Sequence, residues 1–221
     1  MARTRSDNFE AIQQSILKQA VDLFASQGYM RSTIADLADA CEVSRGALYH
    51  YFDSKEAILF AILHNHVSKL LAIIEAAAGE REGARAQLHR MVEAIVEYNA
   101  RSPGEQVVLL NDLTFLDKKE QEIIEGLERH IVDLFADALV RVDSHGRIDR
   151  KTKKVYTMSL LGMINYSYTW FDPAGSVEPR EFAAIICDTF LDGFAASAGA
   201  VPRPVPVDPP AAPRRRTRAG S

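Results

Sequence analysis

Apolar residues recur along this chain at steps of three and four, the spacing that places them on one face of an α-helix. The first such series predicts a helix over residues 7–28, which ends at a glycine. No stretch alternates apolar and polar residues with turn signals between, so the sequence predicts an all-helical fold of nine helices. The other eight are expected at residues 34–41, at 44–52, from residue 54 onward, and at 83–101, 104–115, 118–142, 150–171 and 178–198.

Polar capping residues mark where the short helices begin. Thr33 and Asp36 have the spacing of a capping box, and Ser44 is a good N-cap for the next helix. Asp53 and Glu56 repeat the box ahead of the fourth helix. Two short helices joined by a tight turn, the second opening on Ser44, have the outline of a helix-turn-helix.

Composition divides the chain into three parts. We expect a DNA-binding domain over residues 1–55 and a helical domain for ligand binding and dimerisation over 56–199. Residues 200–221 hold six of the nine prolines and five arginines. Such a composition cannot bury a core, so we expect a disordered tail, either inert or adding salt-sensitive attraction to DNA.

Charge and composition narrow the class of protein without deciding it. The net charge is -4, but residues 1–55 hold six basic and seven acidic residues, so the acid lies mainly in the middle of the chain. No window approaches 18 uninterrupted apolar residues and no secretory signal is evident, so we expect a cytoplasmic protein without a membrane span. Cys41 and Cys187 lack a CxxC partner and are expected in the core.

The second short helix presents a row of residues that core packing explains poorly. Leu48 and Phe52 face inward, which leaves the others outside. Arg45 can reach guanine O6 and N7, and Gly46 and Ala47 are small enough for the backbone to approach the bases. The full set expected to contact DNA is Thr33, Ser44, Arg45, Gly46, Ala47, Tyr49, His50, Tyr51 and Lys55, with Thr33, the aromatic residues and Lys55 on phosphates.

These residues resemble a known family. The runs Ser32-Thr33-Ile34-Ala35-Asp36-Leu37-Ala38, Val43-Ser44-Arg45-Gly46-Ala47-Leu48-Tyr49-His50-Tyr51-Phe52 and Ser54-Lys55-Glu56 look like the DNA-binding head of the TetR family of bacterial transcriptional repressors. The resemblance implies a three-helix head on a ligand-binding body, working as a homodimer that leaves its operator when a small molecule binds. The family often has glycine where this chain has Glu42. A positive φ there would cost roughly 1 kcal/mol.

The body is similar to TetR-family members that sense acyl-CoA thioesters in fatty-acid, steroid or phenylacetate catabolism. The likeness lies in residues 165–175, Glu178-Pro179 and the end of the last helix at 190–194. It implies a long pocket for an acyl group, with the CoA part emerging toward basic residues. A multidrug-efflux regulator that senses apolar or cationic drugs is the alternative, and activation in place of repression stays open.

Polar or aromatic residues within the body helices are candidates for the pocket lining. Asn165 stands out because a buried amide among apolar residues needs a hydrogen-bond partner that a ligand could supply. Arg129 is a candidate for a CoA phosphate or for an internal salt bridge. The complete set is Tyr98, Asn111, Phe115, Arg129, Leu161, Asn165 and Tyr168.

The last two predicted helices are candidates for a dimer interface. Aromatic and aliphatic residues follow an i+4 line on the last helix, and two glycines permit close helix contact. A two-fold four-helix interface is expected, against the alternative that these faces complete a monomeric core. The interface set is Gly162, Phe182, Ile186, Phe190, Gly193 and Phe194.

Catalytic and metal chemistry find little support. His64 and His66 are two residues apart and point in different directions on a helix, so no metal site is expected. We also expect no cofactor. An enzyme acting on acyl thioesters is the remote alternative, but no nucleophile and base pair can be named.

Overall fold

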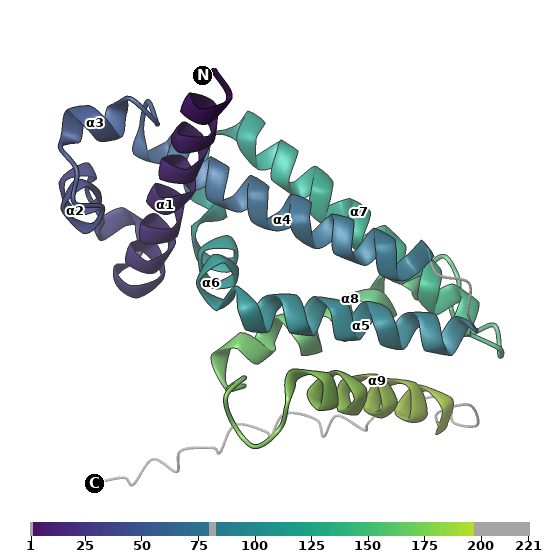
Figure 1. The fold of residues 1–221 in the computed structure, drawn as a ribbon. Helices are drawn as coiled ribbons and strands as arrows, with labels where there is room; N and C mark the ends of the chain where they lie inside the picture. Colours follow the sequence, from purple (N-terminus) through teal and green to yellow (C-terminus); the bar gives the residue numbers. More distant parts are fainter. Residues whose placement is uncertain (1, 80–82, 197–221) are drawn as a thin grey trace, which may run out of the picture.

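Two groups of helices make up the fold in the computed structural model, which describes residues 2–79 and 83–196, with side chains for 9–79 and 83–193. A head of α1–α3 lies at one end, and α4 leads from it into a body of α5–α9 (Figure 1). Within the described residues the nine α-helices and the absence of strands confirm the predicted fold class. The helices are α1 (Ala2–Gln27), α2 (Ile34–Ala40), α3 (Arg45–Tyr49), α4 (Lys55–Gly79), α5 (Ala84–Arg101), α6 (Pro103–Asp112), α7 (Lys118–Val142), α8 (Lys153–Asn165) and α9 (Pro179–Ala196), with 3₁₀ turns η1 (Tyr29–Arg31), η2 (Leu113–Phe115) and η3 (Tyr166–Thr169).

The long helix α4 forms the centre of the molecule. An 18-residue window in it has a mean hydropathy of 1.7, so by length and composition alone it is apolar enough to cross a membrane. In the fold it packs against α1, α5, α6 and α7, and ten of its side chains are buried. We therefore interpret α4 as a core helix whose apolar surface is covered by its neighbours.

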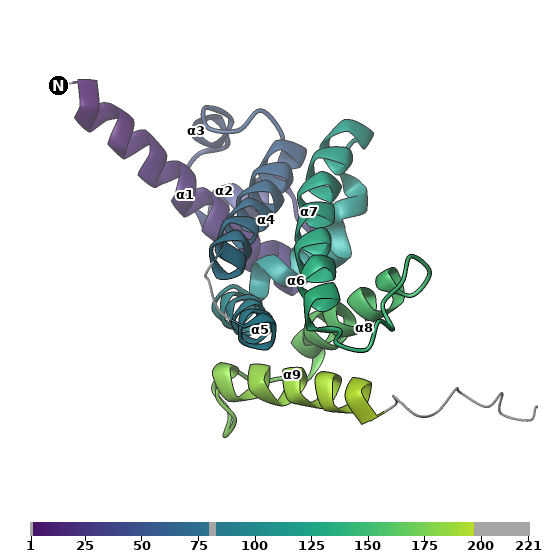
Figure 2. The same cartoon turned by 90° about the vertical axis from the view of Figure 1, so that its right-hand side faces the viewer.

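Several helix boundaries differ from the expected ones: the helix predicted to reach residue 52 ends at Tyr49, and the one predicted to reach residue 115 ends at Asp112 and continues as η2. Helix α1 starts five residues earlier and projects beyond the rest of the molecule (Figure 2). Ser54, and not Asp53, caps α4, because the Ala57 backbone N–H donates to Ser54 Oγ at 3.1 Å. The predicted helix over 150–171 is shorter: α8 ends at Asn165 and tightens into η3, where the Ser167 hydroxyl donates to the Ile164 carbonyl at 2.7 Å.

Helix α6 ties the body to the head by lying very close to α1. Gly104, in its first turn, has no side chain where a Cβ would lie only 2.7 Å from Cγ1 of Val21. A larger residue there would force the two helices apart. Any movement of α6 is therefore felt directly by α1.

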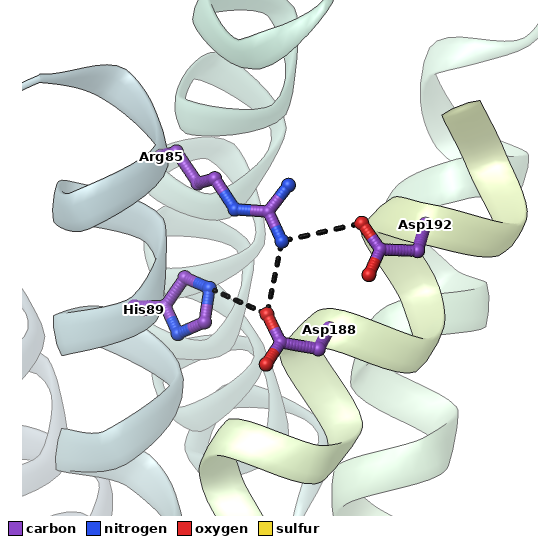
Figure 3. A network of polar contacts seen from close by, with 4 residues as sticks. All are labelled: Arg85, His89, Asp188 and Asp192. Carbon is purple, nitrogen blue, oxygen red and sulfur yellow. Dashed lines mark hydrogen bonds and ion pairs between the residues drawn. The ribbon is translucent and has the colours of Figure 1, made fainter.

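Helix α9 is held against α5 by a group of ion pairs (Figure 3). The Arg85 guanidinium contacts Asp188 at 2.9 Å and Asp192 at 3.3 Å, and the His89 ring contacts Asp188 at 3.3 Å. Arg180 and Glu93 form another pair, at 2.9 Å, nearer the other end of α9. Such exposed pairs contribute little each, but together they fix which side of α9 faces α5.

Candidate DNA-binding and effector sites

The start of α2 is held by the capping box that the sequence predicts. The Thr33 backbone N–H donates to Oδ2 of Asp36 at 2.8 Å, and the Asp36 backbone N–H donates to Oγ1 of Thr33 at 3.2 Å. Hydrogen bonds from the Thr33 side chain and backbone lower the pKa of Asp36. The cap fixes the angle at which α2 leaves the preceding turn.

The turn between α2 and α3 requires a left-handed residue. Glu42 has φ 55°, and the other positive φ values among the described residues belong to glycines. The predicted backbone strain at Glu42 is therefore present. The turn is closed by the Val43 backbone N–H, which donates to the Ala38 carbonyl at 3.0 Å.

Helix α3 shows one face to the core and the other to solvent. Ser44 caps it as predicted, since its Oγ accepts from the Ala47 backbone N–H at 3.1 Å. Leu48 is fully buried, whereas Arg45, Gly46, Tyr49 and His50 are exposed. A short, firmly capped helix thus displays an arginine near its N-terminus, where the backbone of Gly46 is also accessible.

Lys55 has partners within the head itself. Its ammonium group donates to the carbonyls of Tyr29 at 3.0 Å and Ser32 at 2.9 Å. It also lies 4.0 Å from the centre of the Tyr29 ring. The side chain therefore stabilises the turn before α2, a structural task in addition to the phosphate contact expected from the sequence.

Tyr29 is the point where the head meets the body. Its ring stacks on that of Phe115, and its hydroxyl donates to Oε1 of Glu56 at 2.9 Å. The Tyr29 backbone also hydrogen-bonds to the buried carboxyl group of Asp112, and burial raises the pKa of that group. The end of α6 is therefore bound to the turn that precedes α2.

Two small cavities lie in the body and share two amide residues, Gln106 and Asn165. The first, of about 70 Å³, lies among α5, α6, α8 and η3, and the second, of about 60 Å³, among α4–α8. The first is lined by residues that include Val96, Ala100, Val107, Tyr168, Phe171 and Pro173. The second is lined by residues that include Leu70, Leu109, Leu110, Glu128, Ile131 and Leu161.

Gln106 connects these cavities to the centre of the molecule. It is buried, and its Oε1 lies 3.3 Å from Nε2 of His66 on α4. The His66 ring stacks on Tyr98, and burial lowers the pKa of His66. A few polar groups converging on mostly apolar walls are the usual features of a small-molecule site.

Known proteins resemble this chain along nearly its whole described length. Residues 16–62 match the family described as bacterial regulatory proteins, tetR family, and residues 81–194 match the tetracyclin repressor-like C-terminal domain. A TetR-family transcriptional regulator from Bordetella parapertussis 12822 is 35% identical, with a TM-score of 0.79, and the match covers 84% of this chain and 96% of that one. The chain belongs to the TetR family.

Two further relatives of this TetR-family chain have informative names. The repressor KstR2 of Rhodococcus jostii RHA1 is 26% identical over 81% of this chain and 89% of that protein. The structure of AibR in complex with isovaleryl coenzyme A and operator DNA is 22% identical, with a TM-score of 0.72, and is matched over 80% of this chain and 97% of that one. Three other relatives are matched over 30%, 63% and 48% of their own length. The chain is thus a helix-turn-helix regulator of transcription with a C-terminal domain of the ligand-binding kind.

Three of the DNA-contact residues predicted for this TetR-family head are less exposed than expected. Ala47, Tyr51 and Lys55 are half-buried, and the Tyr51 ring packs on Phe9 of α1 at 4.7 Å. The Thr33 hydroxyl already donates to Asp36 at 2.8 Å. DNA contacts by the whole set stay a prediction.

Only three of the seven residues predicted for the effector pocket lie at the two cavities: Leu161, Asn165 and Tyr168. Tyr98 lines a separate cavity between α1 and α4–α6. Phe115 packs on Tyr29, and the exposed Asn111 amide donates to the Val107 carbonyl at 2.7 Å. Arg129 pairs with Glu125 at 3.5 Å on the surface of α7, where both side chains are exposed, and not in the internal salt bridge that was one of its two predicted roles.

The sequence analysis missed Gln106 and Glu128. Both are polar residues whose neighbours one turn away on the same face are apolar, Leu109 and Ile131 respectively. That signal was available but weak, because many glutamines and glutamates at such positions are solvated. Phe171 was also missed, since it follows η3 in a segment predicted to be the end of a helix.

The predicted interface residues of α8 and α9 separate into two groups. Phe182 and Ile186 are 7% and 4% exposed and belong to the core of the single chain, so the prediction that they meet a partner is wrong. Phe190 is half-buried, and the side chain of Phe194 lies outside the described residues. Gly162 and Gly193 are exposed, beside the apolar surface residues Val155, Met158, Tyr166 and Ile185.

Among the side chains that the structure describes, those of residues 9–79 and 83–193, no group of three His, Cys, Asp or Glu is placed to hold a metal ion.

Proposed function

We propose that this protein is a cytoplasmic repressor that binds a palindromic operator as a homodimer and is released by an acyl-CoA thioester. The observation that carries the proposal is the pair of cavities that share Gln106 and Asn165. Gln106 lies near the start of α6, the helix that contacts the head. The names of KstR2 and AibR support it, since one is a repressor and the other was seen with isovaleryl coenzyme A and operator DNA.

On DNA, α3 enters the major groove and Arg45 reads a guanine, while the polar groups around it hold phosphates. Two heads on one face of the duplex must lie about 34 to 36 Å apart, one turn of DNA. This spacing is what an effector has to disturb.

The homodimer forms through the exposed faces of α8 and α9. Val155, Met158 and Gly162 of α8 and Tyr166 of η3 follow one another at helical spacing and are exposed, and Ile185 is an exposed apolar residue of α9. A Cβ at Gly162 would meet nothing within 4 Å in the single chain. Two copies can therefore bring their α8 helices close together at this glycine.

The acyl group occupies the first cavity, and the CoA part leaves through the groove beside it. That groove, of about 350 Å³, shares Ala100 and Pro173 with the first cavity and carries two arginines, Arg101 and Arg180, together with two glutamates, Glu97 and Glu178. The two cavities are far smaller than the roughly 300 to 1,000 Å³ of a typical ligand pocket. Binding must therefore widen the space between α6 and α8.

Widening at Gln106 and Asn165 displaces α6. Because α6 touches α1 at Gly104 and Tyr29 through Asp112 and Phe115, the displacement turns the head. Helix α4, about 37 Å long, amplifies a small tilt over its length. The two recognition helices then no longer match the operator spacing.

The test is a titration of operator DNA by fluorescence anisotropy, with and without a panel of acyl-CoAs that includes isovaleryl-CoA. We expect one or more thioesters to weaken operator binding, and Asn165→Leu to blunt that response with nearly unchanged affinity in the absence of effector. Asn111→Leu is the matched control, since Asn111 is exposed and lies at neither cavity. If no thioester moves the curve while a cationic drug does, the multidrug alternative replaces the acyl-CoA assignment.

A further inference from the structure

Glu128 carries a carboxyl group whose surroundings disfavour its ionised form. It is half-buried and lines the second cavity from α7, where the other lining residues are apolar apart from the two shared amides and include Leu70, Leu109 and Ile131. Burial raises the pKa of Glu128, and the nearby charge of Glu125 raises it further. A ligand that fills the cavity would take this half-buried carboxyl group out of contact with water, which is costly unless the ligand supplies a hydrogen bond or a positive charge.

Within the described part of the chain, no side chain supplies such a hydrogen bond or positive charge to Glu128. No hydrogen bond or cation is among the influences on Glu128, all of which raise its pKa. Arg129, the next residue, turns to the surface and contacts Glu125 at 3.5 Å. The local arginine thus neutralises the exposed glutamate and leaves the one at the cavity.

The side-chain amides of Gln106 and Asn165 are the other polar groups in the wall of the second cavity. Gln106 uses its Oε1 on His66, so its NH₂ group is the part left to a ligand. Asn165 lines both cavities and can donate or accept. A ligand that enters between α6 and α8 meets these amides first and Glu128 behind them.

We infer that the effector carries a hydrogen-bond donor on its apolar part and that Glu128 accepts from it. The inference rests on the proposed function for the location of the effector, and it narrows the chemical class. A plain saturated acyl chain would leave the carboxyl group buried and unpaired, whereas a hydroxylated acyl chain or a protonated amine would pair with it. Glu128 is therefore the specificity-determining residue of the cavity.

The experiment compares ligands that differ in the donor alone. Isothermal titration calorimetry and operator anisotropy are run with hexanoyl-CoA against 3-hydroxyhexanoyl-CoA and 6-hydroxyhexanoyl-CoA, and with octylamine against octyltrimethylammonium. The second pair carries the same charge, but only octylamine has N–H donors. We expect the ligand with the donor to bind roughly tenfold tighter within its pair, as for a hydrogen bond to a charged group.

Variants assign that preference to one residue. Glu128→Leu should abolish it, Glu128→Gln should keep part of it because the amide oxygen still accepts, and the control Glu125→Gln should leave it intact. Without ligand, Glu128→Leu should also raise the melting temperature, because a half-buried carboxyl group beside the charge of Glu125 is replaced by an apolar side chain. A marked drop in melting temperature would mean that Glu128 has a partner inside the chain, which would overturn the inference.

The outcomes separate this inference from the proposed function. If hexanoyl-CoA acts as well as its hydroxylated forms, the acyl-CoA proposal stands and the inference is wrong. If only octylamine acts and Glu128→Leu abolishes its binding, the inference stands and the acyl-CoA proposal falls. Equal binding of octylamine and octyltrimethylammonium, a preference that survives in Glu128→Leu, or no binding in either series overturns the inference.

Discussion

The rings of Tyr29 and Phe115 stack with centroids 5.4 Å apart and planes inclined by 25°, across the boundary between head and body. Phe115 ends η2, which continues α6, and α6 also carries Gln106 at the cavities. Tyr29 in turn contacts Glu56 and Lys55 at the start of α4. One short segment therefore links the candidate effector site to the turn that precedes α2, the first helix of the helix-turn-helix.

Phe115→Ala should weaken this link without damaging either site. We expect operator affinity without effector to stay nearly unchanged, and the effector-induced loss of affinity to shrink about fivefold or more, within the usual range of coupling free energies. The measurement is the operator titration with and without the active effector. Ile123→Ala is the matched control, because Ile123 and Phe115 are both 40% exposed and Ile123 lies on α7 away from Tyr29.

Phe115 also shows what the sequence can and cannot predict. Its helical context and aromatic character were evident, and they placed it in the body near the cavity. Its actual partner, Tyr29, lies 86 positions earlier in the chain, in a turn whose direction depends on the Thr33 cap and the Gly28 backbone. Periodicity identifies the face of a helix that is covered, but not the element that covers it.

Arg45 and Lys55 should respond differently to replacement by alanine. Arg45 is exposed and unpaired with the core of the head, so Arg45→Ala should cost about 1 to 3 kcal/mol of operator binding and relax the preference at one base pair per half-site. Lys55→Ala removes two hydrogen bonds to carbonyls, so it should also lower the free energy of unfolding, by roughly 1 to 3 kcal/mol.

Thermal or urea unfolding of both variants, beside operator titrations at several salt concentrations, tests this division of roles. Lys55→Ala is expected to weaken binding to all sequences alike. An unfolding midpoint for Lys55→Ala equal to that of the wild type would show that its carbonyl contacts are unimportant. Equal loss of sequence preference from both variants would contradict the role of Arg45.

The head was predictable because its function depends on local signals. The caps at Thr33 and Ser44 and the buried Leu48 follow from residue types at fixed spacing, whereas the strained turn at Glu42 follows from the family resemblance. The cavities were less predictable than the head, because Gln106 and Asn165 come together only through the packing of α6 against α8. The interface prediction failed at Phe182 for a similar reason: its i+4 stripe was real, but α5 and the Phe171 ring cover it within the chain.

Gly162→Glu should separate assembly from folding. In a single chain a Cβ at this position meets no neighbour within 4 Å, and a residue other than glycine generally favours a helix, by up to roughly 1 kcal/mol. In the proposed dimer it places a side chain and a charge where two α8 helices meet. We therefore expect monomers of undiminished helicity that have lost most operator affinity.

Sedimentation velocity and circular dichroism make this measurement, with Gly126→Glu on α7 as the control. Gly126 is also inside a helix, and a Cβ there would have only an ordinary contact, 3.8 Å from Nη2 of Arg129. The control should stay dimeric. If the Gly162→Glu variant is still a dimer, α8 does not form the interface.

His66 should make stability depend on pH in a window that can be stated from its surroundings. Burial lowers its pKa in the folded protein, while the unfolded chain takes up a proton near pH 6.5. Between these two values the unfolded state binds more protons, so the free energy of unfolding falls as the pH drops below about 6.5 and levels off below the folded-state pKa. Glu128 and Asp112, whose pKa values are raised by burial, act in the opposite direction at lower pH.

Urea denaturation at a series of pH values from about 7.5 to 5, for the wild type and His66→Gln, isolates the contribution of the histidine. The wild type should lose stability relative to the variant across this range. Parallel curves for the two proteins would mean that His66 titrates alike in the folded and unfolded states, contrary to its burial beside Gln106.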